Sequence, residues 1–278
     1  MIIAEAIASV KQAHVGQAAC LPVCGRLPTC GRSGECYRAV SAHEGTNRKD
    51  PAAVRRMFTA IAPRYDLLNH LLSFGSDRRW RRRACELATP RPGARALDVC
   101  AGTGDLALAC LERHPQLAHI SLTDFAEPML ALARAKADGV PRRRIAYGCA
   151  DALRLPYADE SFDLVLCAFG LRNLADVGAA LRELRRVTRP GGELIALEFC
   201  RQHLPWYAWL GRLWLRCVVP VVGRSLSRHR SAYVYLPTSR EAFLSPEELK
   251  QELEAAGYRD VRHELLTFGV ATLFVARR

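Results

Sequence analysis

A glycine-rich turn, and an aspartate about twenty residues after it, are the parts of this chain whose residue types and spacing most directly indicate chemistry. The apolar run 94–99 leads into the turn Gly102-Thr103-Gly104, and the next apolar run, 120–123, ends in Asp124. Where a strand, a tight glycine turn, a helix and a second strand follow one another, the glycines let the backbone approach a nucleoside and the acid accepts its ribose hydroxyls. We therefore expect Gly102 and Gly104 to shape a nucleoside site and Asp124 to bind the ribose.

A further acid and a second glycine turn follow in the same order along the chain. Asp151-Ala152 comes after the apolar run 144–148, which suits recognition of an adenine edge, and Pro190-Gly191-Gly192 turns into the run 193–199. This series favours S-adenosylmethionine as the ligand. The first glycine turn also satisfies the pattern G-x-G-x-x-A, so a nicotinamide oxidoreductase stays open as an alternative at this point, as does a similar core that binds no nucleoside.

Strands alternate with helices from residue 94 onward, and this alternation predicts an α/β fold with a parallel sheet. Strands are expected near 94–99, 118–123, 144–148, 162–168 and 192–198, and helices near 104–113, 127–137 and 176–188. Ser245-Pro246-Glu247-Glu248 predicts a helix start, because Ser caps a helix, Pro suits its first position and Glu its third. The runs 261–266 and 270–276 predict a closing hairpin. The expected architecture is a Rossmann-like, mostly parallel sheet of seven strands with an antiparallel C-terminal hairpin.

Three other stretches of the chain resemble the motifs of one family. Met57-Phe58-x-x-Ile61-Ala62-x-x-Tyr65-Asp66-x-x-Asn69, Phe169-Gly170-Leu171-Arg172-Asn173 and Leu197-Glu198-Phe199 are similar to the quinone C-methyltransferases of menaquinone and ubiquinone biosynthesis. The resemblance runs from about Val54 to the C-terminus. It implies a class I methyltransferase that transfers the methyl group of S-adenosylmethionine to a ring carbon of a prenylated quinol and that needs no metal. The implied substrate is demethylmenaquinol, and the 2-polyprenyl-6-methoxybenzoquinol precursor of ubiquinone is the alternative.

The resemblance also implies which residues bind the cofactor and which act on the acceptor. The expected cofactor-binding residues are Gly102, Thr103, Gly104, Asp124, Asp151 and Ala152, with Asp98 or Asp105 near the α-ammonium group. The expected catalytic residues are Arg172 and Asn173. A guanidinium is too basic to serve as a general base, so Arg172 is expected to bind phenolate charge or orient a water, and Asn173 to bind a quinol oxygen.

Four other residues are weaker candidates for contact with the acceptor. Tyr65, Asp66 and Asn69 lie in the N-terminal motif, and Glu198 is a candidate proton acceptor. Ala168 stands where the family often has Ser or Thr, so a hydroxyl contact is not expected there.

The sequence divides into an extension and one domain. Residues 1–48, which contain Cys, Gly and Pro, are expected to be a disordered extension, and 49–278 the methyltransferase domain. Helices within 49–90 are expected to cover the acceptor site, and 201–244 to form an insert or lid. Three of the four tryptophans lie in 204–226, interleaved with arginines. This composition is typical of a lid over an apolar substrate, of a membrane-contact helix or of a buried cap helix.

The net charge and the arginine content bear on which partners the protein could bind. The formal net charge is +12, and the run 78–83 contains five arginines that suit phosphates, anionic lipid headgroups or simply a solvated helix face. A nucleic-acid methyltransferase is a distant alternative, because the chain has neither an RNA-binding module nor the Asn/Asp-Pro-Pro-Tyr turn of base amino-methylation after the fourth strand. A non-catalytic scaffold of the same fold is another alternative.

The chain has 11 cysteines, an odd number, and we expect reduced thiols, with a zinc site at 20–36 as a minor alternative.

The expected location follows from hydropathy and substrate. No apolar run reaches the roughly 18 residues of a spanning helix. We expect a cytoplasmic protein that touches the inner face of the membrane, binds no nucleic acid and, as an option, forms a homodimer.

Overall fold

The computed structural model describes residues 50–201, 235 and 238–278. By its internal contacts the chain divides into two units, 1–43 and 44–278, and all described residues belong to the second. The expectations for the extension 1–48 and for the tryptophan-rich segment 204–226 lie outside the described residues.

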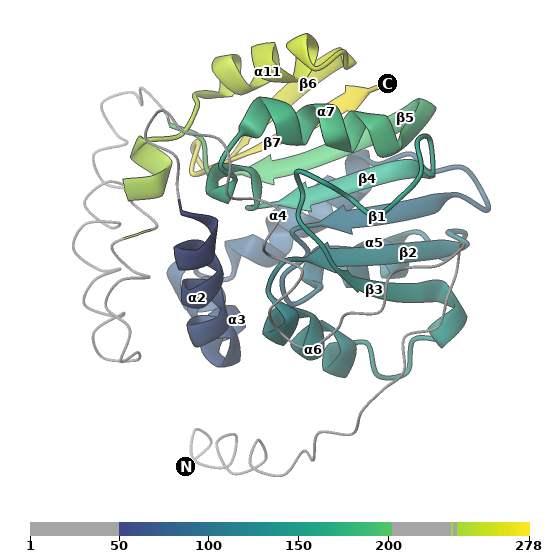
Figure 1. The fold of residues 1–278 in the computed structure, drawn as a ribbon, viewed down its shortest axis with the longest axis horizontal. Coiled ribbons are helices and arrows are strands. Elements are labelled where there is room, and N and C mark those ends of the chain that lie inside the picture. Colours follow the sequence, from purple (N-terminus) through teal and green to yellow (C-terminus); the bar gives the residue numbers. More distant parts are fainter. Residues whose placement is uncertain (1–49, 202–234, 236–237) are drawn as a thin grey trace. The chain divides into compact units, whose positions relative to one another are not determined.

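A seven-stranded sheet in the order β3-β2-β1-β4-β5-β7-β6 forms the centre of the described unit (Figure 1). The pairs among β1 to β5 are parallel, whereas β7 pairs antiparallel with both β5 and β6. This confirms the predicted class I methyltransferase architecture with its antiparallel C-terminal hairpin. The strands are β1 Arg95–Val99, β2 His119–Asp124, β3 Ile145–Cys149, β4 Phe162–Ala168, β5 Thr188–Glu198, β6 Arg259–Leu266 and β7 Ala271–Arg277.

Helices cover both faces of this sheet, and successive strand residues alternate between two apolar cores. On one face Ile195 and Leu197 pack in a core with residues of α4, α5 and α6, and on the other Leu194 and Ala196 pack with residues of α7 and α11. Strands buried on both faces read as continuous apolar runs, which is why they stand out in the sequence. The helices are α2 Pro51–Ile61, α3 Tyr65–Leu72, α4 Ser76–Leu87, α5 Asp105–Arg113, α6 Glu127–Lys136, α7 Val177–Val187 and α11 Pro246–Ala255.

Local sequence sets two helix starts, and the structure confirms the predicted one at Ser245. Ser245 caps α11 through its side chain, which accepts from the Glu248 amide, while the Glu248 carboxylate accepts from the Ser245 amide at 2.7 Å. Asp50 caps α2 in the same way, accepting from the Ala52 amide at 2.9 Å. None of the helices in the described ranges is long and apolar enough to span a bilayer.

One strand boundary differs from the prediction. β5 begins at Thr188, not at 192, because Thr188 already pairs with Phe162 before the Pro-Gly-Gly turn. The ladder then shifts register between Phe162 and Leu164, and Gly191 sits in the shifted part with φ +75°. The glycine turn is therefore an irregularity within the strand rather than its start.

Candidate active site

The glycine turn after β1 adopts a conformation that few other residues tolerate. Gly102 and Gly104 have φ of +55° and +81°, in the left-handed region. A Cβ on Gly104 would lie 3.0 Å from the Leu122 side chain and 3.1 Å from the Ala133 Cβ, so α5 can start close to β2 only with glycine there. The turn thus leaves its backbone open at the carboxyl ends of β1 and β4, where the strand order reverses and α/β sheets bind ligands.

Asp124 lies at the end of β2, beside the glycine turn. One carboxylate oxygen accepts from the Gly102 amide and the other from the Ala126 amide, each at 2.9 Å. Burial raises the pKa of Asp124 to about 6, and the backbone amides oppose this. The Phe125 amide also acts on this carboxylate, so of the roughly four lone-pair positions of its two oxygens at least one stays available to a hydroxyl group.

Asp98 and Asp105, the two acids expected near an ammonium group, have different environments. Asp98 Oδ2 accepts from the Ala107 amide at 3.1 Å, whereas Asp98 Oδ1 is buried and has no hydrogen-bond partner among the described residues. Burial raises the pKa of Asp98 to about 8. Asp105 is instead paired with Lys136 at 2.5 Å and Arg81 at 3.5 Å. Of the two, Asp98 is the acid with an acceptor to spare.

The third acidic position follows β3 at the same edge of the sheet. β3 pairs with β2 so that Cys149 lies beside Asp124, and Asp151 comes two residues later. Asp151 Oδ1 accepts from the Leu153 amide at 2.9 Å, which shapes the turn, and Ala152 is buried in the second core. The structure therefore brings the glycine turn, Asp124 and Asp151-Ala152 to one edge, as the sequence predicts.

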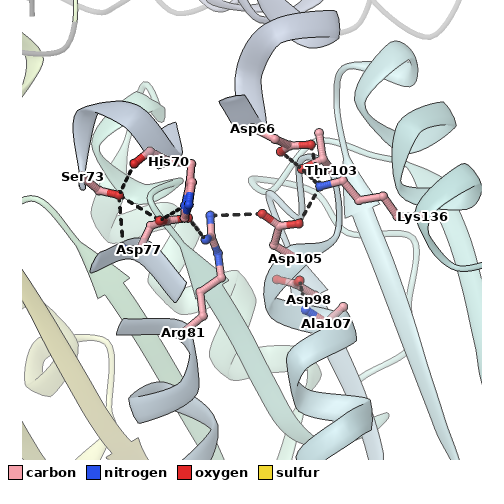
Figure 2. Close-up of polar contacts among 10 residues, drawn as sticks. All are labelled: Asp66, His70, Ser73, Asp77, Arg81, Asp98, Thr103, Asp105, Ala107 and Lys136. Carbon is pink, nitrogen blue, oxygen red and sulfur yellow. Dashed lines mark hydrogen bonds and ion pairs between the residues drawn. The ribbon is translucent and has the colours of Figure 1, made fainter. Parts of the chain in front are cut away.

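An ion-pair network joins the N-terminal helices to the glycine turn (Figure 2). Lys136 of α6 contacts Asp66 at 2.6 Å and Thr103 Oγ1 at 2.9 Å, and the Thr103 hydroxyl donates to Asp66 at 2.6 Å. With the hydroxyl engaged in this way, a ligand contact by Thr103 falls to its backbone. Asp66 is thus a residue of this network rather than a group facing an acceptor.

The network continues into α4. Arg81 is buried and bonds to Asp77 at 2.6 Å, and Asp77 also accepts from Ser73 at 2.8 Å and lies 3.2 Å from His70 (Figure 2). These hydrogen bonds hold the pKa of Asp77 below its usual range against the opposing effect of burial. Together the contacts fix α3 over the glycine turn, where the Tyr65 ring approaches Gly102.

Arg172 and Asn173 lie in a short 3-10 turn, Leu171–Asn173, directly after β4. Arg172 is only 6% exposed, and its Nη1 donates at 2.7 Å both to the Phe169 carbonyl and to Glu198, which is fully buried at the end of β5. The Glu198 carboxylate also accepts the amides of Arg172 and Phe199. Glu198 is therefore the partner that holds Arg172, and its protein contacts leave it poorly placed as a proton acceptor.

Gly170 of the same turn is required by close packing. A Cβ there would lie 2.5 Å from Cys100 Cβ and 2.8 Å from Cys100 Sγ. Cys100 stands just before the glycine turn with φ +55°, unusual for a residue with a side chain. The turn that carries Arg172 and the turn that carries Gly102 therefore touch at these two residues.

Two tyrosines complete the group around Arg172. Tyr235 donates its hydroxyl to Asn173 Oδ1 at 2.9 Å, while Asn173 Nδ2 donates to the Phe169 carbonyl. Burial raises the pKa of both Tyr65 and Tyr235, and the positive charge of Arg172 opposes the rise in each. The sequence does not single out Tyr235 as a site residue, because no motif or spacing distinguishes it from the nearby Tyr233.

Phenol, amide and guanidinium groups at this position suit a neutral phenolic ligand that develops negative charge. The described residues contain no cluster of three or more His, Cys, Asp or Glu that would hold a metal ion. The arrangement places the Arg172 guanidinium beside β4 and the residues of the expected nucleoside site beside β1 and β2.

Comparison with known proteins assigns the chain to a family. The model of the ubiE/COQ5 methyltransferase family matches residues 45–278. The chain belongs to the ubiE/COQ5 methyltransferase family. It is 51% identical over 224 residues to the demethylmenaquinone methyltransferase of Thermus thermophilus, covering 80% of this chain and 100% of the relative. It is 42% identical to the ubiquinone/menaquinone biosynthesis C-methyltransferase UbiE of Geobacter sulfurreducens, covering 81% and 88%.

Solved structures agree with the fold of this ubiE/COQ5 family member. A SAM-dependent methyltransferase from Thermotoga maritima matches with a TM-score of 0.54 and 21% identity, covering 80% of this chain and 98% of that one. Family membership confirms the predicted resemblance and an S-adenosylmethionine-dependent methyltransferase as the class of enzyme. The nicotinamide oxidoreductase alternative is thereby set aside.

Proposed function

We propose that this enzyme methylates a ring carbon of a prenylated quinol, converting demethylmenaquinol to menaquinol. The observation that carries the proposal is the match to the Thermus thermophilus demethylmenaquinone methyltransferase, which is covered over its whole length at 51% identity. The benzoquinol precursor of ubiquinone is the second candidate, because the Geobacter sulfurreducens relative is named for both quinones.

Residues at the carboxyl edge of the sheet would hold S-adenosylmethionine. Gly102 and Gly104 would present backbone, Asp124 would accept from the ribose hydroxyls, and Asp151-Ala152 would border the adenine. Asp98, whose Oδ1 has an unused acceptor position, would bind the α-ammonium. When bound, S-adenosylmethionine supplies an electrophilic methyl group and its own leaving group.

The protein's part in the chemistry is to make the quinol carbon nucleophilic. Loss of a ring hydroxyl proton gives a phenolate, and the Arg172 guanidinium stabilises that charge as it develops. Arg172 keeps its own protons, so the phenolic proton leaves through a water that Arg172 orients. Once the ring carbon has taken the methyl group and the thioether has left, loss of the proton from that carbon and reprotonation of the oxygen restore the aromatic quinol. Asn173 donates to a quinol oxygen, and Glu198 acts as a positioning residue for Arg172.

The low solubility of the proposed substrate also bears on the location at which the enzyme acts. A prenyl tail does not dissolve in water, so we expect transient contact with the inner face of the membrane, with no nucleic-acid partner. We also expect, as an option, that the enzyme forms a homodimer, and sedimentation equilibrium would measure its oligomeric state.

Incubation with labelled S-adenosylmethionine and each of the two demethylated quinols, after chemical reduction, tests the function. We expect label in the naphthoquinol and a dependence on the reductant, because only the quinol has a hydroxyl proton to lose. Label in the benzoquinol alone would favour the second candidate, and label in neither would overturn the proposal.

A further inference from the structure

The hydrogen bonds around Asn173 have directions that the neighbouring groups determine. The Phe169 carbonyl can only accept, so the group of Asn173 that faces it is the amide nitrogen Nδ2, at 3.0 Å. The amide oxygen Oδ1 therefore faces the Tyr235 hydroxyl, 2.9 Å away, and this oxygen also only accepts. The single proton of the Tyr235 hydroxyl is accordingly donated to Asn173.

Two hydrogen-bonding positions remain on Asn173 and Tyr235 after these bonds are made. Asn173 Nδ2 carries two protons and donates one of them to Phe169, which leaves one N–H. The Tyr235 oxygen keeps its acceptor lone pairs, and none of the residues that the structure describes donates to it. The two side chains therefore present one donor beside one acceptor.

This donor and acceptor lie at the candidate acceptor site. Asn173 follows β4 in the same short turn as Arg172, and the Arg172 guanidinium donates to the same Phe169 carbonyl as Asn173 does. Tyr235 is half-buried, and the charges of Arg172 and Glu198 both act on its phenol. We therefore expect a ligand oxygen that lies beside Arg172 to meet Asn173 and Tyr235 as well.

A donor beside an acceptor is the complement of a hydroxyl group. A quinol hydroxyl can accept from the remaining Asn173 N–H and donate its own proton to the Tyr235 oxygen. The carbonyl oxygen of a quinone can accept from Asn173 but has no proton for Tyr235, so two acceptors face each other and one polar contact stays unmade. A site built to receive a hydroxyl proton rejects an analogue that lacks it.

We propose that Tyr235, oriented by Asn173, is the residue by which the enzyme selects a reduced quinol over the oxidised quinone when the acceptor binds. This inference rests on the proposed function, because it concerns the acceptor of that reaction. Tyr235 does not take the proton, since its oxygen only receives a hydrogen bond and Arg172 still orients the water through which the proton leaves. The selection keeps out an acceptor that has no hydroxyl proton to lose.

Ligand binding to the full chain loaded with S-adenosylhomocysteine tests the proposal without turnover. The probes are a short-tailed demethylated naphthoquinol, kept reduced under argon, and the matching naphthoquinone. We expect the wild-type enzyme to bind the quinol about tenfold or more tightly than the quinone. Tyr235→Phe should lose most of this preference through weaker binding of the quinol alone. Equal weakening of both ligands, or an unchanged preference, would overturn the proposal.

Steady-state kinetics separate this role of Tyr235 from a structural one. The bond from the hydroxyl to Tyr235 exists in the bound quinol and is lost when that hydroxyl ionises. Tyr235→Phe should therefore raise the KM for the quinol about tenfold, while kcat stays the same or rises. A residue that only positioned the turn of Arg172 would lower kcat instead. A fall in kcat of about tenfold or more would thus contradict the assignment.

A matched tyrosine is available on the far strand of the sheet. Tyr147 lies in β3 and is also half-buried, with the Arg134 guanidinium 5.1 Å from the centre of its ring. Tyr147→Phe removes the same hydroxyl group and should leave both affinities and both kinetic constants near their wild-type values. Both variants keep their rings, so each should melt within a few degrees of the wild type. An equal loss of preference in Tyr147→Phe would remove the assignment from Tyr235.

The proposed function has a separate readout. Transfer of labelled methyl to the naphthoquinol by the wild-type enzyme tests the reaction, and its absence would overturn the proposed function. The binding experiment contains no methyl donor, so the preference for quinol over quinone would still decide the role of Tyr235.

Discussion

Arg172 is held in place by the protein before any substrate arrives. The Phe169 carbonyl and the Glu198 carboxylate accept from the same guanidinium nitrogen, and the Phe199 ring lies against the group at 5.2 Å. A charge fixed in a buried setting stabilises a developing anion without reorganisation, which is the condition for a large effect on rate.

Removal of this charge should affect turnover rather than cofactor binding. We expect Arg172→Met/Glu198→Gln to lower kcat by about a hundredfold or more and to keep the affinity for S-adenosylhomocysteine, because the stabilised charge exists only once the quinol ionises. Calorimetry and initial rates measure the two effects. The double variant avoids leaving one buried charge unpaired, which would itself cost about 3–5 kcal/mol. Near-normal kcat at saturating quinol would show that the pair is only structural.

The raised pKa of Asp124 predicts a pH dependence of cofactor binding. Burial raises the pKa of its carboxyl to about 6, and ribose hydroxyls bind the ionised form. Ionisation of Asp124 should therefore give a break near pH 6, below which the affinity for S-adenosylhomocysteine falls by up to about tenfold per pH unit, separate from the contribution of Asp98, whose pKa is raised to about 8. Titrations of the enzyme with S-adenosylhomocysteine between about pH 5 and pH 8 measure this change in affinity. Asp124→Asn should bind more weakly and lose the break near pH 6, and a break that persists would assign it to another group.

Gly170 and Cys100 should behave as an energetically coupled pair. Gly170→Ala places a methyl group against Cys100 and should destabilise the fold by about 1–3 kcal/mol. Cys100→Gly removes the clashing atoms and relieves a left-handed φ, so the double variant should recover most of the loss. A cycle of urea denaturation on the four proteins gives the coupling, and additive effects would contradict direct contact.

At the scale of elements, sequence and structure agree best where burial dictates sequence. β1, β2, β4 and the capped helix α11 lie within a residue or two of their predicted positions, because a run of buried apolar residues or a capping box is a local signal. β5 begins four residues before the position that the sequence predicts, because a pairing between Thr188 and Phe162 leaves no signal in the local sequence. The Arg172–Glu198 pair and the contact of Tyr235 are likewise long-range in sequence, and the same holds for the bonds of Lys136 to Asp66 and Thr103.

The network of Lys136 should determine how firmly α3 covers the glycine turn. Lys136→Met leaves Asp66 and Asp105 without their shared cation, and we expect the KM for S-adenosylmethionine to rise several-fold with kcat changed less. The pairs are partly exposed, so the cost in stability should stay near 1 kcal/mol. The matched control is Arg134→Met on the same helix, whose partner Glu127 lies at 2.6 Å on the surface. Equal effects of the two variants would remove the network from cofactor binding.

At the scale of the whole molecule, the family domain and the contact-defined second unit nearly coincide. The family model begins at residue 45 and the second unit at Glu44, while the match to the Thermus thermophilus relative covers all of that protein with 80% of this chain. We therefore expect the first residues to be dispensable for the catalytic unit.

Removal of residues 1–48 should leave catalysis intact. A chain that begins at Lys49 should bind S-adenosylhomocysteine with unchanged affinity and melt within a few degrees of the full chain, because Asp50 still caps α2. Calorimetry and thermal denaturation of the two chains check this. A large loss of affinity would show that the extension takes part in the site.

The hydrogen bond from Tyr235 to Asn173 bears on the order of events during turnover. It joins a residue 62 positions further along the chain to the turn that carries the proposed acceptor groups. If a quinol oxygen binds Asn173, it borders on this phenol, and we expect the methylated ring to leave as this hydrogen bond opens. Product departure and opening of this contact then form a single step. With a cofactor-loaded enzyme, the first methyl transfer is expected to be faster than the steady cycle that follows it.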